Sequence, residues 1–188
     1  MDYYLRIAEE LADKLQQLDK AVLVGILKQY ALYHDDIRAD LQLRLSSPDE
    51  VLEAALQRIR ASFEPCRRRG KHSVKYNDVY EALFGASAVL MLAEDESTDF
   101  QPRERLLMCF AVLEEMGRVC NAIDDDGDIE MIVDNAFRLI PLLAAKIPAA
   151  ELADLLEDHL QRGVEFYIEW SERKEELLAA LGPFLGDQ

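Results

Sequence analysis

Apolar residues recur at helical spacing through the first quarter of the chain. Residues 3–18 and 36–45 place leucines and alanines on one face, with charged residues between them, which is typical of amphipathic helices. Residues 20–33 carry a broader apolar face, and Asp19 is a candidate N-cap for that helix. The broad face comprises Val22, Leu23, Ile26, Leu27, Tyr30 and Ala31. We therefore predict three helices separated by short polar breaks.

The run Ser47-Pro48-Asp49-Glu50 is a strong signal for a helix start. Ser47 and Glu50 have the spacing of a capping box, and Pro48 suits the first helical position. We expect the helix to fray near Glu64–Pro65, because the residue before a proline avoids the helical region. Residues 65–75 are then expected to form a connection. The predicted inward residues of the helix are Val51, Leu52, Ala55, Leu56, Ile59 and Phe63.

Tyr76–Asp95 is the most apolar continuous helical segment, and Asn77 is its candidate N-cap. We expect this segment to lie in the core. After a polar turn at 97–101, Pro102 is expected to begin another long helix that ends near Ile123. The predicted inward residues of this second helix are Leu106, Leu107, Phe110, Leu113, Met116, Val119 and Cys120.

The last third of the chain contains further helical patterns interrupted by glycine and proline. Residues 124–128, DDDGD, have the composition of a turn, and Asp126 or Asp128 can cap the helix that follows. Another helix is predicted over 147–162. Helices are expected to kink, stop or be interrupted at Pro141, Gly163 and Gly182–Pro183.

These patterns predict an all-α protein with eight or nine antiparallel helices and no convincing strand. Residues 1–188 are long enough to bury one core, so we expect a single all-helical domain. Short connections favour antiparallel neighbours. Both a compact bundle and a short HEAT-like helical-repeat stack satisfy the pattern, because no strict sequence period selects between them.

The composition narrows the classes of function. The chain has 37 acidic and 21 basic residues, a net charge of −16, which argues against general binding to nucleic acids or anionic membranes. No apolar run approaches the roughly 20 residues that span a bilayer, and the N-terminal segment does not resemble a secretory signal. Cys66, Cys109 and Cys120 support neither a disulfide framework nor a zinc site. We expect Cys109 and Cys120 to be core residues, a cytoplasmic location and no cofactor.

Clustered carboxylates offer an alternative, catalytic interpretation. Asp124, Asp125 and Asp128 could hold a hard cation such as magnesium, although an EF-hand loop fails because Ile129 and Asn135 stand where glycine and glutamate are needed. A solvated turn is the simpler interpretation. A metal-dependent hydrolase of a phosphorylated small molecule could also use one of three other acidic groups. Such spacings also arise by chance on an acidic helical protein. The three groups are His34-Asp35-Asp36, Glu50/Glu53 and Glu151/Asp154.

A basic run in this acidic chain is the candidate partner-binding segment. Its residues are Arg67, Arg68, Arg69, Lys71 and His72. The run is not a phosphate-binding P-loop, because Pro65 and His72 stand where that motif needs glycine and serine or threonine. It could dock an acidic protein or nucleic-acid phosphate, or pair with the chain's own acids. Glu94, Asp95 and Glu96 are the first acids we expect it to meet.

Three segments show a family resemblance. Residues 18–45, LDKAVLVGILKQYALYHDDIRADLQLRL, resemble the start of the helical region that follows the zinc-binding module in SWIM zinc-finger proteins. VKYNDVYEALFGASAVLMLAED and DDDGDIEMIVDNAF are similar to later stretches of that region, so the resemblance covers about residues 15–140. The paired cysteines and Cys-x-His of the SWIM module are missing, and no zinc site carries over. The resemblance implies a helical, HEAT-like protein-interaction region with no assigned chemistry.

The leading hypothesis from the sequence is a non-catalytic helical interaction or scaffold module with a protein partner. Half of the residues are apolar, so some apolar face is expected to stay exposed and to support a homodimer. The metal-dependent hydrolase and a nucleic-acid-associated accessory protein using the basic run are the alternatives.

Overall fold

The computed structural model describes the backbone of residues 10–69, 76–119, 127–165 and 170–185. Within these ranges the side chains are described too, except those of residues 65–69, 76–78, 81, 160–165 and 170–174. These ranges contain helices and no strand, which confirms the all-α prediction. Residues 10–16 are helical, and the helices that follow are α2 (Lys20–Tyr33), α3 (Asp35–Arg44), α4 (Val51–Arg69), α5 (Tyr76–Glu94), α6 (Pro102–Val119), α7 (Asp128–Ala144), α8 (Ala149–Glu165) and α9 (Trp170–Leu185).

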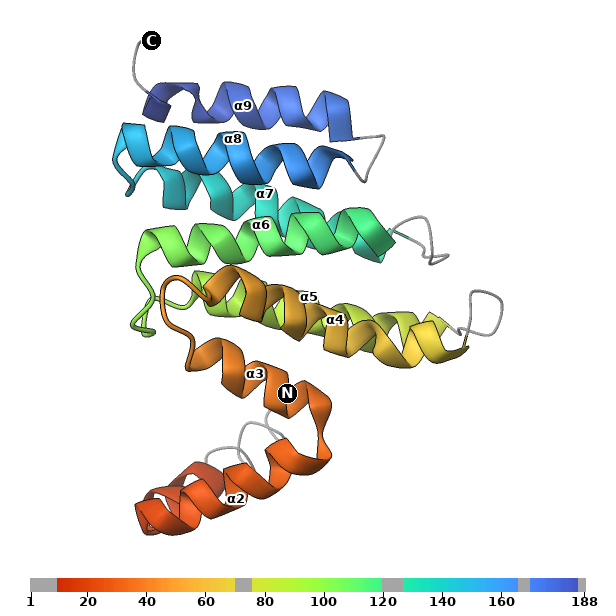
Figure 1. Cartoon of the computed structure of the whole chain (residues 1–188), viewed down its shortest axis with the longest axis vertical. Helices are drawn as coiled ribbons and strands as arrows, with labels where there is room; N and C mark the ends of the chain where they lie inside the picture. The colour runs from red at the N-terminus through yellow and green to blue at the C-terminus, as the bar shows by residue number, and fades with distance from the viewer. Residues whose placement is uncertain (1–9, 70–75, 120–126, 166–169, 186–188) are drawn as a thin grey trace.

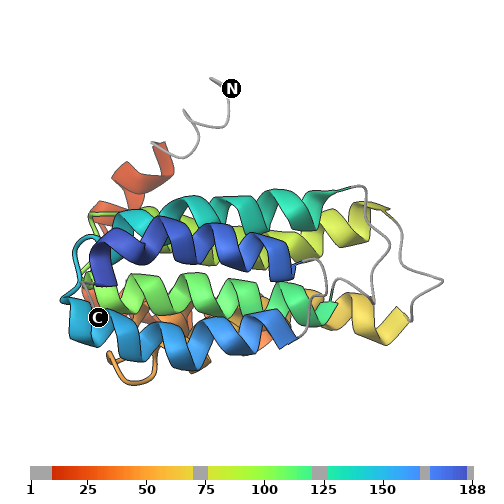
Figure 2. The ribbon, with the colours of Figure 1, turned by 90° about the horizontal axis from the view of Figure 1, so that it is seen from above.

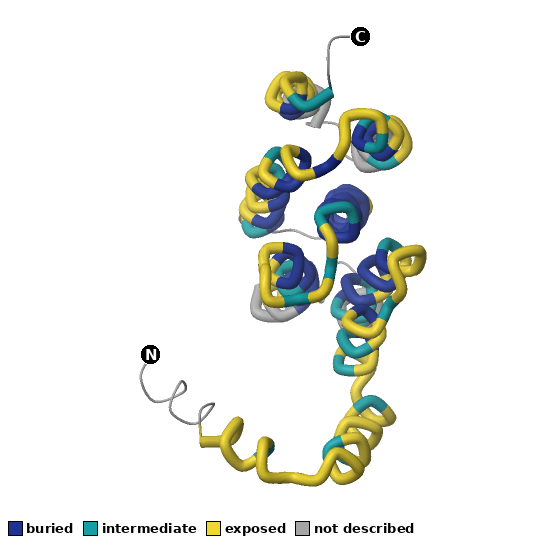
Figure 3. Tube along the Cα trace, turned by 90° about the vertical axis from the view of Figure 1, so that its left-hand side faces the viewer, coloured by how far each residue is buried: buried dark blue, intermediate teal, exposed yellow. Residues whose placement is uncertain are grey.

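Helices α4 to α9 form a stack of three helical hairpins, with successive helices running in opposite directions (Figure 1). Helix α6 packs between α4 and α8 in one layer, and α7 packs between α5 and α9 in the other. The two layers are seen end-on in Figure 3 and from above in Figure 2. This arrangement gives the protein a continuous core along the stack. None of the helices described is long and apolar enough to cross a membrane.

Helix α6 lies at the centre of the core. Fifteen of its eighteen residues are buried, which requires neighbours on all sides, and α4, α5, α7 and α8 all contact it. The predicted inward residues from Leu106 to Val119 are buried, and so is Cys109, whose pKa is raised to about 12 by burial. Cys120 lies outside the described residues.

Helix α6 also carries buried charges, which are neutralised locally. Glu115, 1% exposed, accepts hydrogen bonds from Arg60 of α4 and from Arg118, both at 2.7 Å. Burial opposes the charge on Arg60, but the hydrogen bond and the charge of Glu115 outweigh it and raise the pKa of the guanidinium. Glu114 accepts from the second nitrogen of the Arg118 fork at 2.5 Å. This network joins the first two hairpins, because a buried charge is tolerated only when it is paired and hydrogen-bonded.

Residues 10–33 form an arm that leaves the stack. Helix α2 contacts α3, and α3 in turn packs on α4, so α3 is the connection between the arm and the core. Figure 1 shows α2 directed away from the hairpins, and Figure 3 shows that exposed residues dominate this end of the molecule. We call residues 10–33 the arm from here on.

The helices continue through Pro65, Pro141, Gly163 and Gly182–Pro183, so the predicted helix ends or interruptions at these positions are wrong. The alternative prediction of a kink at Pro141 stays a prediction. An interior proline removes one backbone hydrogen bond, and an interior glycine costs about 1 kcal/mol. Apolar anchors outweigh these costs. Ile140 and Leu143 are buried on either side of Pro141, and Phe184 packs against the core beyond Pro183.

The predicted helix caps are partly corrected. Gly127, not Asp126 or Asp128, is the N-cap of α7, and its φ of 100° lies in the left-handed region that glycine adopts without strain. Glu50 reaches back to the backbone N–H of Ser47 at 3.2 Å, as a capping box requires. The Ser47 hydroxyl, however, donates to Glu50 at 2.7 Å instead of capping an amide. The predicted cap by Asn77 and the predicted helix end near Ile123 stay predictions, because the side chain of Asn77 and the whole of Ile123 lie outside the described residues.

Candidate docking surface

Helix α2 is predominantly apolar, yet none of its residues is buried. A helix of this composition is normally enclosed in a core. Instead, twelve of the fifteen exposed large apolar side chains among the described residues belong either to residues 11–45 or to α5. The exposed large apolar residues of α2 are Val22, Val24, Leu27, Tyr30, Leu32 and Tyr33. Such a concentration of exposed apolar surface marks an interaction site.

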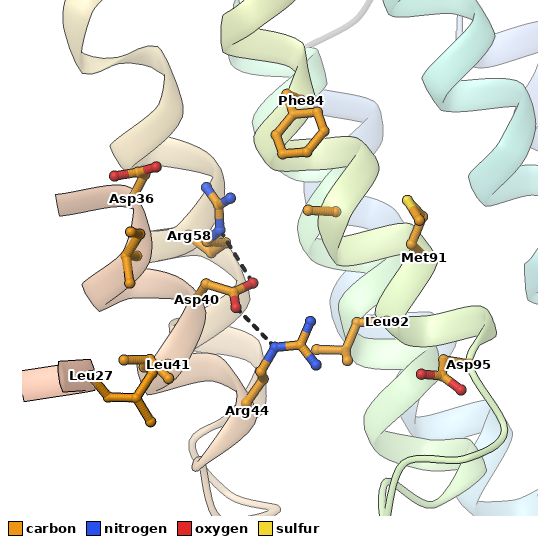
Figure 4. A pocket seen from close by; sticks show the side chains of 12 residues that line it. Leu27, Asp36, Asp40, Leu41, Arg44, Arg58, Phe84, Met91, Leu92 and Asp95 are labelled. Carbon is orange, nitrogen blue, oxygen red and sulfur yellow. Dashed lines mark hydrogen bonds and ion pairs between the residues drawn. The ribbon is translucent and has the colours of Figure 1, made fainter. Parts of the chain in front are cut away.

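A cleft of about 670 Å³ separates the arm and α3 from α5. We call it the arm cleft. Figure 4 shows side chains of α2 and α3 along one wall, facing α5 on the other. Its apolar lining is Leu27, Ile37, Leu41, Phe84, Ala88, Met91 and Leu92, and its charged lining is Asp36, Asp40, Arg44, Arg58 and Asp95. The volume is that of a binding pocket, and the lining suits an apolar ligand that also carries charge.

An arginine from the core lines the cleft. Arg58 of α4 is 5% exposed, and its Nε lies 3.7 Å from Oδ1 of Asp40 on α3. This separation is too long for a hydrogen bond, and Nε has no hydrogen-bond partner among the described residues. Asp40 also accepts from Nε of Arg44 at 2.8 Å. The Asp40 carboxylate therefore pairs with Arg44 within α3 and links α3 to the core through Arg58.

Close packing of α4 on α5 positions the second wall of the cleft. Gly85 of α5 lies so near α4 that a Cβ there would be 2.1 Å from Oγ of Ser62 and 3.3 Å from Nη1 of Arg58. Only glycine permits this approach. It fixes the rotation of α5, so that Ala82, Ala86 and Val89 are buried while the opposite face points outward.

The outward face of α5 carries an apolar stripe formed by Tyr80, Phe84 and Met91, each at least 62% exposed. Spacings of four and seven residues place the three side chains on one face of the helix. Phe84 and Met91 also line the arm cleft. The α5 stripe, the cleft and the arm thus form one continuous docking surface.

Two acids at the end of α5 pair with bases outside the basic run, and contact with the run itself stays a prediction because its side chains lie outside the described residues. Glu94 accepts a hydrogen bond from Arg138 of α7 at 2.9 Å, and Glu96 accepts one from Lys146 at 2.9 Å. The hydrogen bond and charge of Lys146 lower the pKa of Glu96. Asp95 accepts from the hydroxyl and the backbone N–H of Ser97, which lower its pKa.

The candidate partner-binding residues fall partly outside the description. Arg67, Arg68 and Arg69 belong to the last turns of α4 and not to a connection, because α4 passes Pro65. Their side chains, together with Lys71 and His72, lie outside the described residues.

The candidate metal residues are not brought together within the description. Asp128 begins α7, and its buried Oδ2 has no hydrogen-bond partner among the residues described, whereas Asp124 and Asp125 lie outside them. The described residues contain no group of three or more histidine, cysteine or carboxylate side chains that could hold a metal ion.

The other acidic candidates each contact a different partner. Asp35 pairs with Arg38, Glu50 with Ser47, and Glu151 with Arg103 at 3.2 Å. Glu53 lies 3.6 Å from Arg60, on the surface of α4. Glu50 and Glu53 line one shallow pocket beside Arg38, whereas Glu151 lies on α8 and is not part of it.

Sequence analysis missed the arm cleft. Its polar residues, Asp40 and Arg58, are separated by a turn and lie on different helices, so no local motif joins them. One signal was available: residues 20–33 contain Lys20 and Lys28 but no acid, which is unusual in so acidic a chain. Compared with models of protein families, with curated proteins and with solved structures, the chain gives no match. The SWIM resemblance therefore stays a prediction.

Proposed function

We propose that this protein is a non-catalytic helical interaction module whose docking surface is formed by the arm, the arm cleft and the α5 stripe. The observation that carries the proposal is that α2 buries none of its residues despite its apolar composition. Burying a leucine or valine contributes about 1.5–3 kcal/mol, so an isolated chain forgoes several such contributions along the arm. A partner that covers α2 recovers them.

The core supports this role by holding the docking surface in place. The network of Arg60, Glu115 and Arg118 joins the first two hairpins, and the approach at Gly85 orients α5. Surfaces that are held in their bound geometry lose less conformational entropy on association. The stack is therefore suited to presenting the α5 stripe as a rigid face.

Site-specific photocrosslinking tests the proposal. A benzophenone side chain is placed at Phe84 in the arm cleft, or at Met131 on α7, which is 54% exposed and serves as the control. In cells that naturally make the protein, position 84 should give discrete protein adducts that Leu27→Asp weakens at least fivefold. Equal labelling from both positions would contradict the proposal.

An activity assay tests the non-catalytic part. The purified chain should release no phosphate from a panel of nucleotides in millimolar magnesium or manganese, and neither cation should raise its melting temperature. Metal-dependent release that is abolished by Asp124→Asn with Asp128→Asn would replace the proposal with the hydrolase alternative.

A further inference from the structure

We infer that the partner of the docking surface is a second copy of this chain, and that the two copies exchange arms, each α2 entering the arm cleft of the other. The inference rests on the proposed function, because it uses the same surface. Three properties of the described residues support it: complementary charge, matching length and sufficient area.

The charges of α2 and of the arm cleft are complementary. Helix α2 carries Lys20 and Lys28 and no acid, although the whole chain has a net charge of −16. The two lysines are eight residues apart, which places them on one side of the helix, about 12 Å from each other. Of the charged residues in the cleft, Arg44 and Arg58 pair with Asp40, whereas Asp36 lies near one end and Asp95 near the other (Figure 4). Neither Asp36 nor Asp95 forms an ion pair among the described residues. An incoming α2 brings one lysine towards each end.

The lengths also match. The 14 residues of α2 span about 21 Å, and the α5 stripe from Tyr80 to Met91 spans about 16 Å. When α2 lies along the α5 stripe, about one turn of α2 projects beyond it. Leu27 of the arm lines the cleft, and after the exchange Leu27 of the second copy takes its place. Reciprocal exchange of this kind relates the two copies by a two-fold axis.

The area favours reciprocal exchange over one-sided docking. Each copy exposes six large apolar side chains on α2 and three on the α5 stripe. With roughly 100 Å² for each, the surface is roughly 900 Å² in one copy and roughly 1,800 Å² in two. Stable protein interfaces bury about 1,200–2,000 Å² in total. Covering α2 alone buries roughly 600 Å² on each side, at the lower limit of that range, whereas exchange covers both surfaces in both copies.

The corner between α2 and α3 permits the exchange. Helix α2 ends at Tyr33 and α3 begins at Asp35, so His34 is the single connecting residue, and its backbone is extended. A change at this residue redirects the whole arm and breaks the hydrogen bond from Arg38 of α3 to the carbonyl oxygen of Ala31, but it leaves the core of the stack in place. Exchange of an identical element between copies through a short hinge is a low-cost route to a dimer.

Light scattering from about 5 to 200 µM is the first test. The wild-type chain should reach twice 21.4 kDa. Phe84→Asp and Leu27→Asp should each raise the dissociation constant at least tenfold, whereas Met131→Asp, an equally exposed site on α7, should leave it unchanged. A wild-type chain that stays monomeric, or a dimer lost equally in Met131→Asp, overturns the arm exchange.

Charge reversal separates arm exchange from other dimers. Lys20→Glu with Lys28→Glu should weaken the dimer, and so should Asp36→Lys with Asp95→Lys, because like charges meet in both cleft copies. Mixing the two variants should restore a heterodimer, since each arm then meets a cleft of opposite charge. No heterodimer in the mixture overturns the exchange. The photocrosslinking result at Phe84 is independent of it: adducts to another protein with a monomeric chain would leave the interaction module standing and refute only the second copy as its partner.

Discussion

In helices α6 and α2 the amino-acid composition is the opposite of what their burial would lead one to expect. Helix α6 contains two glutamates in succession and four other charged residues, yet fifteen of its eighteen residues are buried. Helix α2 contains two lysines and no acid, yet it buries none of its fourteen residues. Composition alone would place α2 in the core and α6 nearer the surface. Burial in this protein is therefore set by the number of neighbouring helices, not by the hydrophobicity of the segment.

The difference has an energetic reason. The charges of α6 have partners within the stack: Glu115 binds Arg60 and Arg118, and Arg105 donates to the carbonyl oxygen of Phe100 at 2.9 Å. Paired charges can be enclosed without a large penalty. The apolar side chains of α2 have few apolar neighbours to pack against, because α3, the helix that α2 contacts, is short and polar. The stack buries the residues of α6 without help from the arm, whereas α2 buries none of its own residues.

Truncating one leucine in each helix should give the largest contrast. Leu113 of α6 is 1% exposed, so Leu113→Ala should lower the free energy of unfolding by about 2–5 kcal/mol. Leu27 of α2 is 46% exposed, and Leu27→Ala in the monomeric chain should change it by less than about 0.5 kcal/mol. Urea unfolding measures both values. Similar losses at the two positions would show that the arm belongs to the cooperative core.

The glycines of the two regions should respond with opposite signs. Gly85→Ala forces a Cβ into Ser62 and should cost about 1–3 kcal/mol. Gly25 in α2 has open space around it, so Gly25→Ala should stabilise that helix by about 0.5–1 kcal/mol. Equilibrium unfolding tests the first change, and hydrogen exchange of the α2 amides tests the second. A stabilising Gly85→Ala would refute the close approach of α4 and α5.

Acid should weaken the stack and spare α2, which is the smallest of the expected effects. Hydrogen bonds from Ser47, Ser97 and Lys146 lower the pKa values of Glu50, Asp95 and Glu96 respectively. Carboxyls with lowered pKa values in the folded state contribute stability above their usual values of 3.8 to 4.5, and the contribution is lost as the pH falls through the lowered values.

Unfolding midpoints measured between pH 7 and pH 2.5 should therefore decline below about pH 4. Ser97→Ala with Lys146→Ala should flatten this decline, because both substitutions remove groups that lower a pKa. Exchange in α2, which has no carboxyl of its own, should follow only its intrinsic pH dependence. An unchanged slope in the double variant would argue against these two contacts.

The periodicity of apolar residues was sufficient to locate the helices, because that period reports local helical structure directly. It placed Tyr76–Asp95 within one residue of α5 and Pro102 at the start of α6. Its errors lie at local breakers. Pro141 and Pro183 discourage helix in isolation, but each is followed by apolar side chains that pack on the core. Whether such anchors find neighbours is a tertiary property that local patterns do not contain.

The docking surface could not be predicted for the same reason. Residues 20–33 and 76–95 are similarly apolar, and nothing local distinguishes the exposed helix from the buried one. The contacts that decide the matter join distant positions, such as Arg60 with Glu115 and Glu94 with Arg138. The lysines of α2 were visible in the sequence, but their meaning depends on the acidic cleft that α3 and α5 build together.

The single residue between α2 and α3 makes the arm a lever. Its fulcrum is His34, and its length is that of α2, about 21 Å. A rotation of 10° at the fulcrum sweeps the far end of α2 by roughly 4 Å, which is about the width of one side chain. Small torsional adjustments at one position thus translate into large displacements of apolar surface. The chain can vary the reach of its arm without any repacking of its core.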